Sequence, residues 1–141
     1  MNSPFASLSG LCAFTLAAAS LALGPSGGDT KRARTGPWGA VGIAMEVTES
    51  GARIELDCAH GTISEPILLD SEGRLDVKGL YFREHGGPIR EGEESKGEPV
   101  HYVGQVTRDT MTLTIKSEGS DTAIGSYTLV HGKSGRIRKC L

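Results

Sequence analysis

The four histidines are the first residues to consider for catalysis or metal binding, because imidazole titrates near neutral pH and ligates metals. They are His60, His85, His101 and His131, and no two of them share a spacing that would place both on one element as metal ligands. Asp57 and His60 could hold a metal on a turn, but the solvated end of a strand accounts for the same pair. The sequence therefore predicts no metal site and no cofactor.

The cysteines offer either a thiol nucleophile or a disulfide. A nucleophilic Cys58 would need a neighbouring base such as His60 and a third group that orients this base. A disulfide between Cys58 and Cys140 is the simpler use of both thiols in an oxidising compartment, and two buried free thiols are the alternative. The chain also lacks the Gly-x-Ser-x-Gly, phosphate-loop and His-Glu-x-x-His motifs. We therefore expect no catalytic residues and no enzymatic activity.

Four aromatic residues are candidates for ligand binding, namely Trp38, Tyr81, Tyr102 and Tyr127. Tyrosines on the inward faces of strands could line a small cavity that is partly polar and partly apolar. A core position with a hydrogen-bonded hydroxyl is the commoner use of a tyrosine. We therefore expect these residues to contact a ligand, with core packing as the alternative.

A long polar segment extends from Arg83 to Pro99 and includes five glutamates, among them Glu91, Glu93, Glu94 and Glu98. Connections longer than about 12–15 residues are uncommon and are usually functional or disordered. The spacing of the glutamates is not that of an EF-hand, so a calcium site is not predicted. We expect the loop 83–99 to serve as a lid or a partner contact, with disorder as the alternative.

The N-terminal segment is typical of a targeting sequence. Residues 1–28 contain no Lys, Arg, Asp or Glu, and residues 5–23 are apolar or small. This pattern predicts a signal peptide over 1–28 and a secreted or periplasmic protein. An uncleaved membrane anchor over 5–23 is the alternative, because the apolar stretch is long enough and basic residues follow it. These basic residues belong to a segment, 29–36, that we expect to be a flexible tail.

Charge and length limit the classes of partner. The 15 Lys and Arg residues against 17 Asp and Glu give a net charge of −2, which provides no basic field for nucleic acid. The 141 residues suit one domain, and the 20 glycines follow no collagen period. We expect a monomer whose partner is a small ligand or an extracellular protein, with membrane contact only through an uncleaved N-terminal segment.

From Trp38 onward the apolar residues repeat with a period of two, which predicts strands. Turn residues divide this region into eight strands, at 41–47, 54–58, 63–69, 75–81, 100–106, 111–116, 126–130 and 136–141. A meander of this length has to cover its edges or close, and eight strands close a small barrel. The sequence therefore predicts an all-β fold, an antiparallel up-and-down barrel spanning 37–141, with a two-sheet sandwich as the alternative.

The start of this domain resembles that of a known superfamily. Gly36-Pro37-Trp38 is similar to the Gly-x-Trp opening of the calycin barrels, which include lipocalins, avidins and small secreted bacterial protease inhibitors. In these proteins the tryptophan packs across one end of the barrel beneath a basic side chain from the last strand. The resemblance implies that Arg136 or Arg138 covers Trp38. The short chain is closer in length to avidins and the inhibitors than to lipocalins.

We expect an exported, non-catalytic binding module. It would take a small ligand in the barrel mouth or a protein partner at the loop 83–99. One alternative is a secreted inhibitor of an extracellular enzyme such as a protease, acting through residues 29–36 and the rim loops. The other alternative is a small hydrolase or metal-dependent enzyme.

Overall fold

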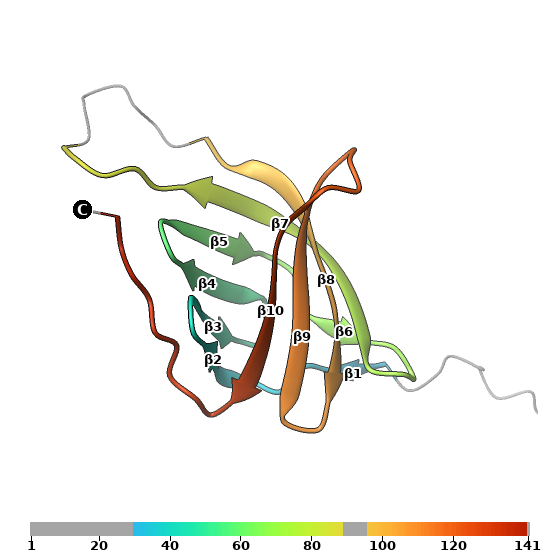
Figure 1. Ribbon diagram of the computed structural model, residues 1–141. Helices are drawn as coiled ribbons and strands as arrows, with labels where there is room; N and C mark the ends of the chain where they lie inside the picture. Colours follow the sequence, from blue (N-terminus) through green and yellow to red (C-terminus); the bar gives the residue numbers. More distant parts are fainter. Residues whose placement is uncertain (1–29, 89–95, 141) are drawn as a thin grey trace, which may run out of the picture.

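The computed structural model describes residues 30–88 and 96–140, and this part of the chain is all β with no helix. Eight strands form a closed antiparallel barrel in the order β10-β2-β3-β4-β5-β7-β8-β9 (Figure 1). Their bounds are Gly36–Ala40 (β2), Ile43–Val47 (β3), Ala52–Leu56 (β4), Ala59–Ile63 (β5), Arg74–Arg83 (β7), Glu98–Thr107 (β8), Thr110–Ser117 (β9) and Ala123–His131 (β10). Two short strands, β1 (Lys31–Arg32) and β6 (Leu68–Leu69), pair with each other outside the barrel. The closed barrel confirms the predicted fold class and excludes the two-sheet sandwich.

Period-two alternation places one side of each strand inside the barrel. In β3, Ile43, Met45 and Val47 are buried while Glu46 is exposed. Strands that are neighbours in the barrel are also neighbours along the chain, apart from the closing pair β10–β2 and the excursion through β6. The predicted meander is therefore correct. The predicted signal peptide or anchor over 1–28 lies outside the described residues, as do residues 89–95 of the long loop.

Three predicted strands differ from the structure. The first one is preceded by a separate strand, β2, because Gly42 adopts a φ of +84° and turns the chain back after Ala40. The predicted strand 63–69 does not form as one strand, because Pro66 has no N–H to donate to a neighbouring strand. The strand β5 ends at Ile63, before this proline. The predicted strand 136–141 contributes only one isolated parallel bridge, from Arg136 to Val41. The barrel still has eight strands, as predicted, because β2 is gained and the predicted strand 136–141 is lost.

The segment predicted as a flexible tail, 29–36, includes the short strand β1 among its described residues, and Lys31 of this strand pairs with Leu69. Ala33 is buried, and its N–H donates to the carbonyl of Ile67 at 2.9 Å. Burial of this small side chain ties the segment to the barrel, so its basic residues are held in place.

Trp38 closes one end of the barrel, which we call the Trp38 end. Its side chain is fully buried, and the indole N–H donates to the carbonyl of Arg34 at 3.0 Å. The ring packed against it is that of His131, edge-on with centroids 4.9 Å apart. Arg136 and Arg138, the residues expected to cover this indole, are exposed and do not contact it. The reason is that β10 ends at His131, so the two arginines follow the last strand and lie outside the barrel.

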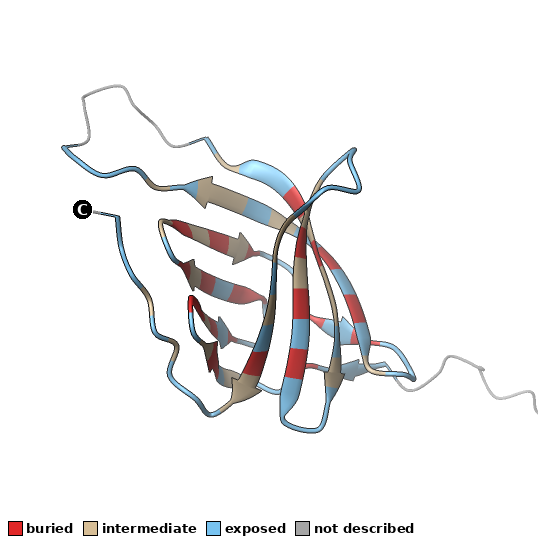
Figure 2. Ribbon diagram, viewed as in Figure 1, coloured by how far each residue is buried: buried red, intermediate tan, exposed pale blue. Residues whose placement is uncertain are grey.

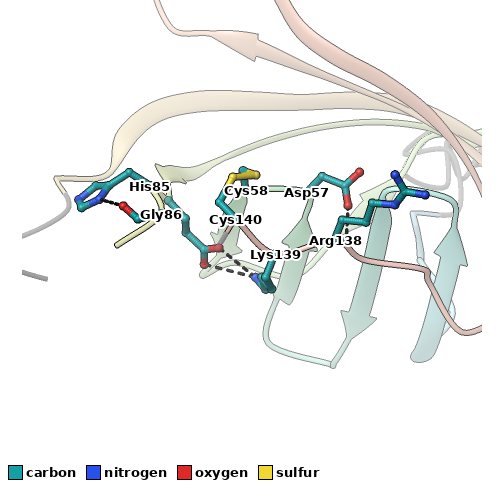
Figure 3. The surroundings of a disulfide bond; sticks show 8 residues. Asp57, Cys58, His85, Gly86, Arg138, Lys139 and Cys140 are labelled. Atoms are coloured by element: carbon teal, nitrogen blue, oxygen red, sulfur yellow. Dashed lines mark hydrogen bonds and ion pairs between the residues drawn. A yellow bond between two sulfur atoms is a disulfide. The ribbon is translucent and has the colours of Figure 1, made fainter. Parts of the chain in front are cut away.

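The residues 132–140, which we call the C-terminal segment, run along the outside of β2 and β3 from the Trp38 end to the opposite end (Figure 1). Arg136 donates its N–H to the carbonyl of Ala40 at 3.1 Å and accepts one from Gly42 at 2.8 Å. The segment ends at Cys140, which forms the predicted disulfide with Cys58 across a Cα–Cα distance of 4.9 Å (Figure 3). Cys58 lies in the turn between β4 and β5, so the disulfide joins this turn to the C-terminal segment. The two cysteines therefore do not have to lie on neighbouring strands.

Tyr102 fills the middle of the barrel. It is fully buried, and its hydroxyl donates to the carbonyl of Leu80 at 2.7 Å. The ring lies over Gly61 on β5 and Gly79 on β7, where a Cβ atom would collide with it. Two missing side chains on neighbouring strands therefore make the space that one phenol ring occupies.

Candidate functional site

The two ends of the barrel differ in how completely their inward side chains are buried. At the Trp38 end, Met111 and Leu129 have no exposed surface. At the opposite end, four hydrophobic residues that pack against the core are only half-buried, namely Ala40, Tyr81, Ile124 and Tyr127. We call these four residues the tyrosine mouth. Figure 2 shows that β10 is buried only toward its C-terminal end. Of the half-buried hydrophobic residues at the core, only Val106 lies at the Trp38 end, so within the described residues the interior is more accessible to solvent at the tyrosine mouth.

The tyrosine mouth combines side chains from three strands. Tyr81 lies near the end of β7, and its backbone pairs with Gly61 of β5 and Glu98 of β8. Tyr127 lies on β10, where its ring packs over Gly125. A register shift between Ala123 and Gly125 precedes it, so β10 is irregular where it borders the mouth.

The hydroxyl groups of Tyr81 and Tyr127 form no hydrogen bond with any described residue. Burial raises the pKa of Tyr127, and the neighbouring Tyr81 and Asp57 raise it further. The pKa of the deeper Tyr102 is raised more strongly, again first by burial and then by Tyr81. These effects favour the neutral phenols of Tyr127 and Tyr102, so the Tyr127 hydroxyl in the mouth is available as a hydrogen-bond donor at neutral pH.

The rim beside the mouth carries a network of charges on the outer surface. Lys139 of the C-terminal segment donates to Glu55 at 2.6 Å and to Glu84 at 3.1 Å. Glu84 also accepts from His60 Nδ1 at 2.9 Å, and the His60 ring stacks on Phe82 with centroids 4.7 Å apart. Partial burial opposes ionisation of Glu84, but the bonds from His60 and Lys139 prevail and lower its pKa. The hydrogen bond to Glu55 is the main reason why the pKa of Lys139 is raised.

This network holds the C-terminal segment through Lys139. His60 and Glu84 have the geometry of a base and its orienting carboxylate, but the thiol that the sequence offered beside them, Cys58, is in the disulfide. Asp57 accepts the N–H of Arg138 at 2.6 Å, whereas His60 bonds to Glu84, so the suggested metal pair has two different partners. Within residues 30–88 and 96–140, no three His, Cys, Asp or Glu side chains come together as a ligand set.

The structure therefore gathers three of the four aromatic residues that the sequence singled out. Tyr81, Tyr102 and Tyr127 lie on one side of the interior, and only Tyr102 uses its hydroxyl inside the protein. Trp38 lies at the opposite end, in contact with His131. Sequence reasoning missed this histidine, although it occupies the inward position two residues after Leu129 on the last strand. It also missed Lys139, for which the sequence carried no signal.

The fold and the mouth define a class, that of small, closed, eight-stranded antiparallel barrels with one filled and one accessible end. The described part of the chain has no helix that is long and apolar enough to span a membrane. The chain matches none of the protein-family models, curated proteins or solved structures with which it was compared.

Proposed function

We propose that this protein is an exported, non-catalytic binding module that takes a small ligand in the tyrosine mouth. The observation that carries the proposal is the pair of half-buried tyrosines, Tyr81 and Tyr127, whose hydroxyl groups lack a hydrogen-bond partner among the described residues. Polar groups that are partly removed from water are stabilised when they gain a partner. A ligand with hydrogen-bond acceptors would supply that partner.

The chemistry of the mouth limits the ligand. Two phenol rings and Ile124 offer apolar surface, and the neutral hydroxyl groups donate hydrogen bonds, so the ligand has a flat or apolar body with carbonyl or ether oxygens. The Asp57 carboxylate near Tyr127 disfavours an anion. Tyr102 occupies the interior beneath the mouth, so the ligand is small and bound near the surface.

The resemblance to calycin barrels supports the same function. In this structure Trp38 packs across one end, as the tryptophan of that superfamily does, and the opposite end is accessible. Membership in the superfamily and export of the chain are parts of the proposal.

The inhibitor alternative receives less support, because it needs residues before Trp38 to reach a protease. These residues are held against the barrel through the bonds from Trp38 to Arg34 and from His131 Nε2 to the carbonyl of Thr35, at 2.9 Å. A protein partner at the loop 83–99 would use a different surface from the mouth. Deleting the residues before Trp38 would abolish protease binding by an inhibitor and would leave the ligand in the mouth.

The test is native mass spectrometry of the protein exported by a bacterial host and purified gently. We expect a shortened chain, oxidised by the loss of two hydrogens, that carries a reproducible small adduct. Replacing Tyr81 and Tyr127 together by Phe should reduce retention of this adduct about tenfold, the effect of losing two hydrogen bonds. The matched control is Tyr102→Phe, which should lower stability and leave the adduct in place. The proposal fails if no adduct is found, or if the adduct persists in the Tyr81→Phe/Tyr127→Phe variant.

A further inference from the structure

A second concave surface lies at the Trp38 end, opposite to the tyrosine mouth. It is a groove of about 680 Å³ between the β1–β6 pair and the turn that joins β8 to β9, and we call it the basic groove. Its basic residues are Lys31, Arg32, Arg34 and Arg108. They come from two parts of the chain that are more than seventy residues apart in sequence (Lys31 to Arg108), so only folding brings them together.

The acidic residues at the groove already have partners within the protein. Asp70 accepts backbone N–H groups from Arg74 at 2.8 Å and from Glu72 at 2.9 Å, and its pKa is lowered, above all by the bond from Arg74. Glu72 forms an ion pair with Arg74. Arg34 forms one with Asp109, in the β8–β9 turn.

Three cations of the groove are left without such partners. The side chains of Lys31, Arg32 and Arg108 form no hydrogen bond or ion pair with the described residues. They are exposed, yet their backbone is held, since β1 is paired with β6 and Ala33 beneath it is buried. Like charges held on one concave surface repel one another unless an anion lies between them. Guanidinium groups are well suited to bind phosphate oxygens in pairs.

We propose that the basic groove binds a ligand that carries phosphate groups. Three fixed cations match the charge of two phosphates, and Leu69 and Val106 add an apolar part to the lining. Both soluble diphosphates and phospholipid headgroups have this chemistry. The headgroup source applies to a chain that keeps the apolar residues 5–23 as an anchor, because these residues precede Lys31 by only a few positions. The inference does not depend on the proposed function, because the groove and the mouth lie at opposite ends of the barrel.

The test compares two variants that each lose two positive charges. Arg32→Gln/Arg108→Gln removes charge from the groove, and Arg53→Gln/Lys78→Gln removes it from exposed positions on β4 and β7 of the outer barrel wall. Inorganic pyrophosphate is titrated into each protein by calorimetry at low ionic strength. Co-sedimentation with phosphatidylcholine vesicles, with and without phosphatidylglycerol, tests the headgroup. Circular dichroism confirms that both variants are folded.

We expect the groove variant to bind at least about tenfold more weakly than the parent protein, and the wall variant to bind within about twofold of it. Binding of pyrophosphate identifies a soluble ligand, and binding only to the anionic vesicles identifies a headgroup; either result supports the proposal. The proposal is overturned if the parent protein binds neither, or if the two variants lose affinity equally, which would show a general effect of net charge.

Discussion

Removing the disulfide should cost this protein a large part of its stability. Cys58 and Cys140 are 82 positions apart, so the bond closes a loop of about 80 residues in the unfolded chain. The loop-entropy relation gives about 4.5 kcal/mol at 25 °C for such a loop. A domain of this size has a free energy of unfolding of about 5–15 kcal/mol. The Cys58→Ser/Cys140→Ser variant should therefore be close to the limit of folding.

Trp38 is a suitable reporter for the measurement. It is the only tryptophan in the chain and is fully buried, so its fluorescence will change when the barrel opens. With a urea dependence of about 1.5 kcal/mol per molar, a loss of 4.5 kcal/mol moves the midpoint of unfolding down by about 3 M. The slope itself should increase in the variant, because a chain without the cross-link exposes more surface when it unfolds.

Two results would refute this reasoning. A midpoint shift below about 0.5 M would mean that the loop contributes little entropy, for instance because the unfolded chain stays compact. A shift that disappears when Lys139→Ala is introduced into both proteins would mean that the disulfide acts only by positioning the ion pairs of Lys139 with Glu55 and Glu84. The parent protein measured after reduction is the control, and it should behave like the serine variant.

Three further predictions concern the core and the rim. Gly61→Ala should lower the free energy of unfolding by about 1–3 kcal/mol, because the new methyl group collides with the hydroxyl end of Tyr102; urea unfolding measures this. His131→Ala should cost about 1–3 kcal/mol in the same assay, by removing a ring contact with Trp38 and a hydrogen bond, and it should shift the fluorescence of the folded state. The pKa of Glu84 is lowered in the folded state, so its ionised form stabilises the protein; this contribution is complete above the ordinary value of 4.5 and is lost as the pH falls through the lowered value. Acid unfolding of Glu84→Gln should therefore show less loss of stability below about pH 4.5 than the parent protein.

Matched variants test the cause in each case. In a Tyr102→Phe background, Gly61→Ala should lower the free energy of unfolding by less, because the hydroxyl oxygen that collides with the new methyl group is absent. If the losses of the two substitutions simply add, the proposed clash is contradicted. His101→Ala, on the outer wall, should lower the free energy of unfolding much less than His131→Ala does. Equal losses would argue against the contact between His131 and the indole. Glu98→Gln, which removes a long surface ion pair with Arg83, should leave the acid response unchanged.

The number of cysteines predicted the disulfide, and the positions of the tyrosines along their strands predicted which of them face inward. An even number of cysteines after the apolar segment suggested the Cys58–Cys140 bond, which the structure contains. Alternation placed Tyr81, Tyr102 and Tyr127 on inward faces, and a strand has only two faces to choose from. Which of the hydroxyl groups would remain unpaired was not predictable, because Tyr102 finds its acceptor, the carbonyl of Leu80, on a neighbouring strand 22 residues away in sequence.

Two of the predicted strand boundaries were wrong, one at a turn and one at the end of the chain's last strand. Gly42 looked like one more residue of an alternating strand, but its positive φ makes it a turn. Residues 136–140 alternate like a strand, yet they follow the last strand, β10, and run beside the turn after Ala40, where they form only one parallel bridge, from Arg136 to Val41. A period of two reports which side chains can face a core, and it does not report whether a partner strand is available.

The sequence by itself determined that this is an all-β domain of short antiparallel strands, because period-two alternation and turn residues are local signals, and the two cysteines after the apolar segment made a disulfide the simplest prediction. Only the tertiary structure decided that the two barrel ends differ, that His131 packs against Trp38, and that Lys31, Arg32 and Arg108 meet in one groove. These features join residues far apart in the chain, and their positions follow from the register and closure of the sheet. The tyrosine mouth and the basic groove are both of this second kind, since each is assembled from strands and turns that meet only in the closed barrel.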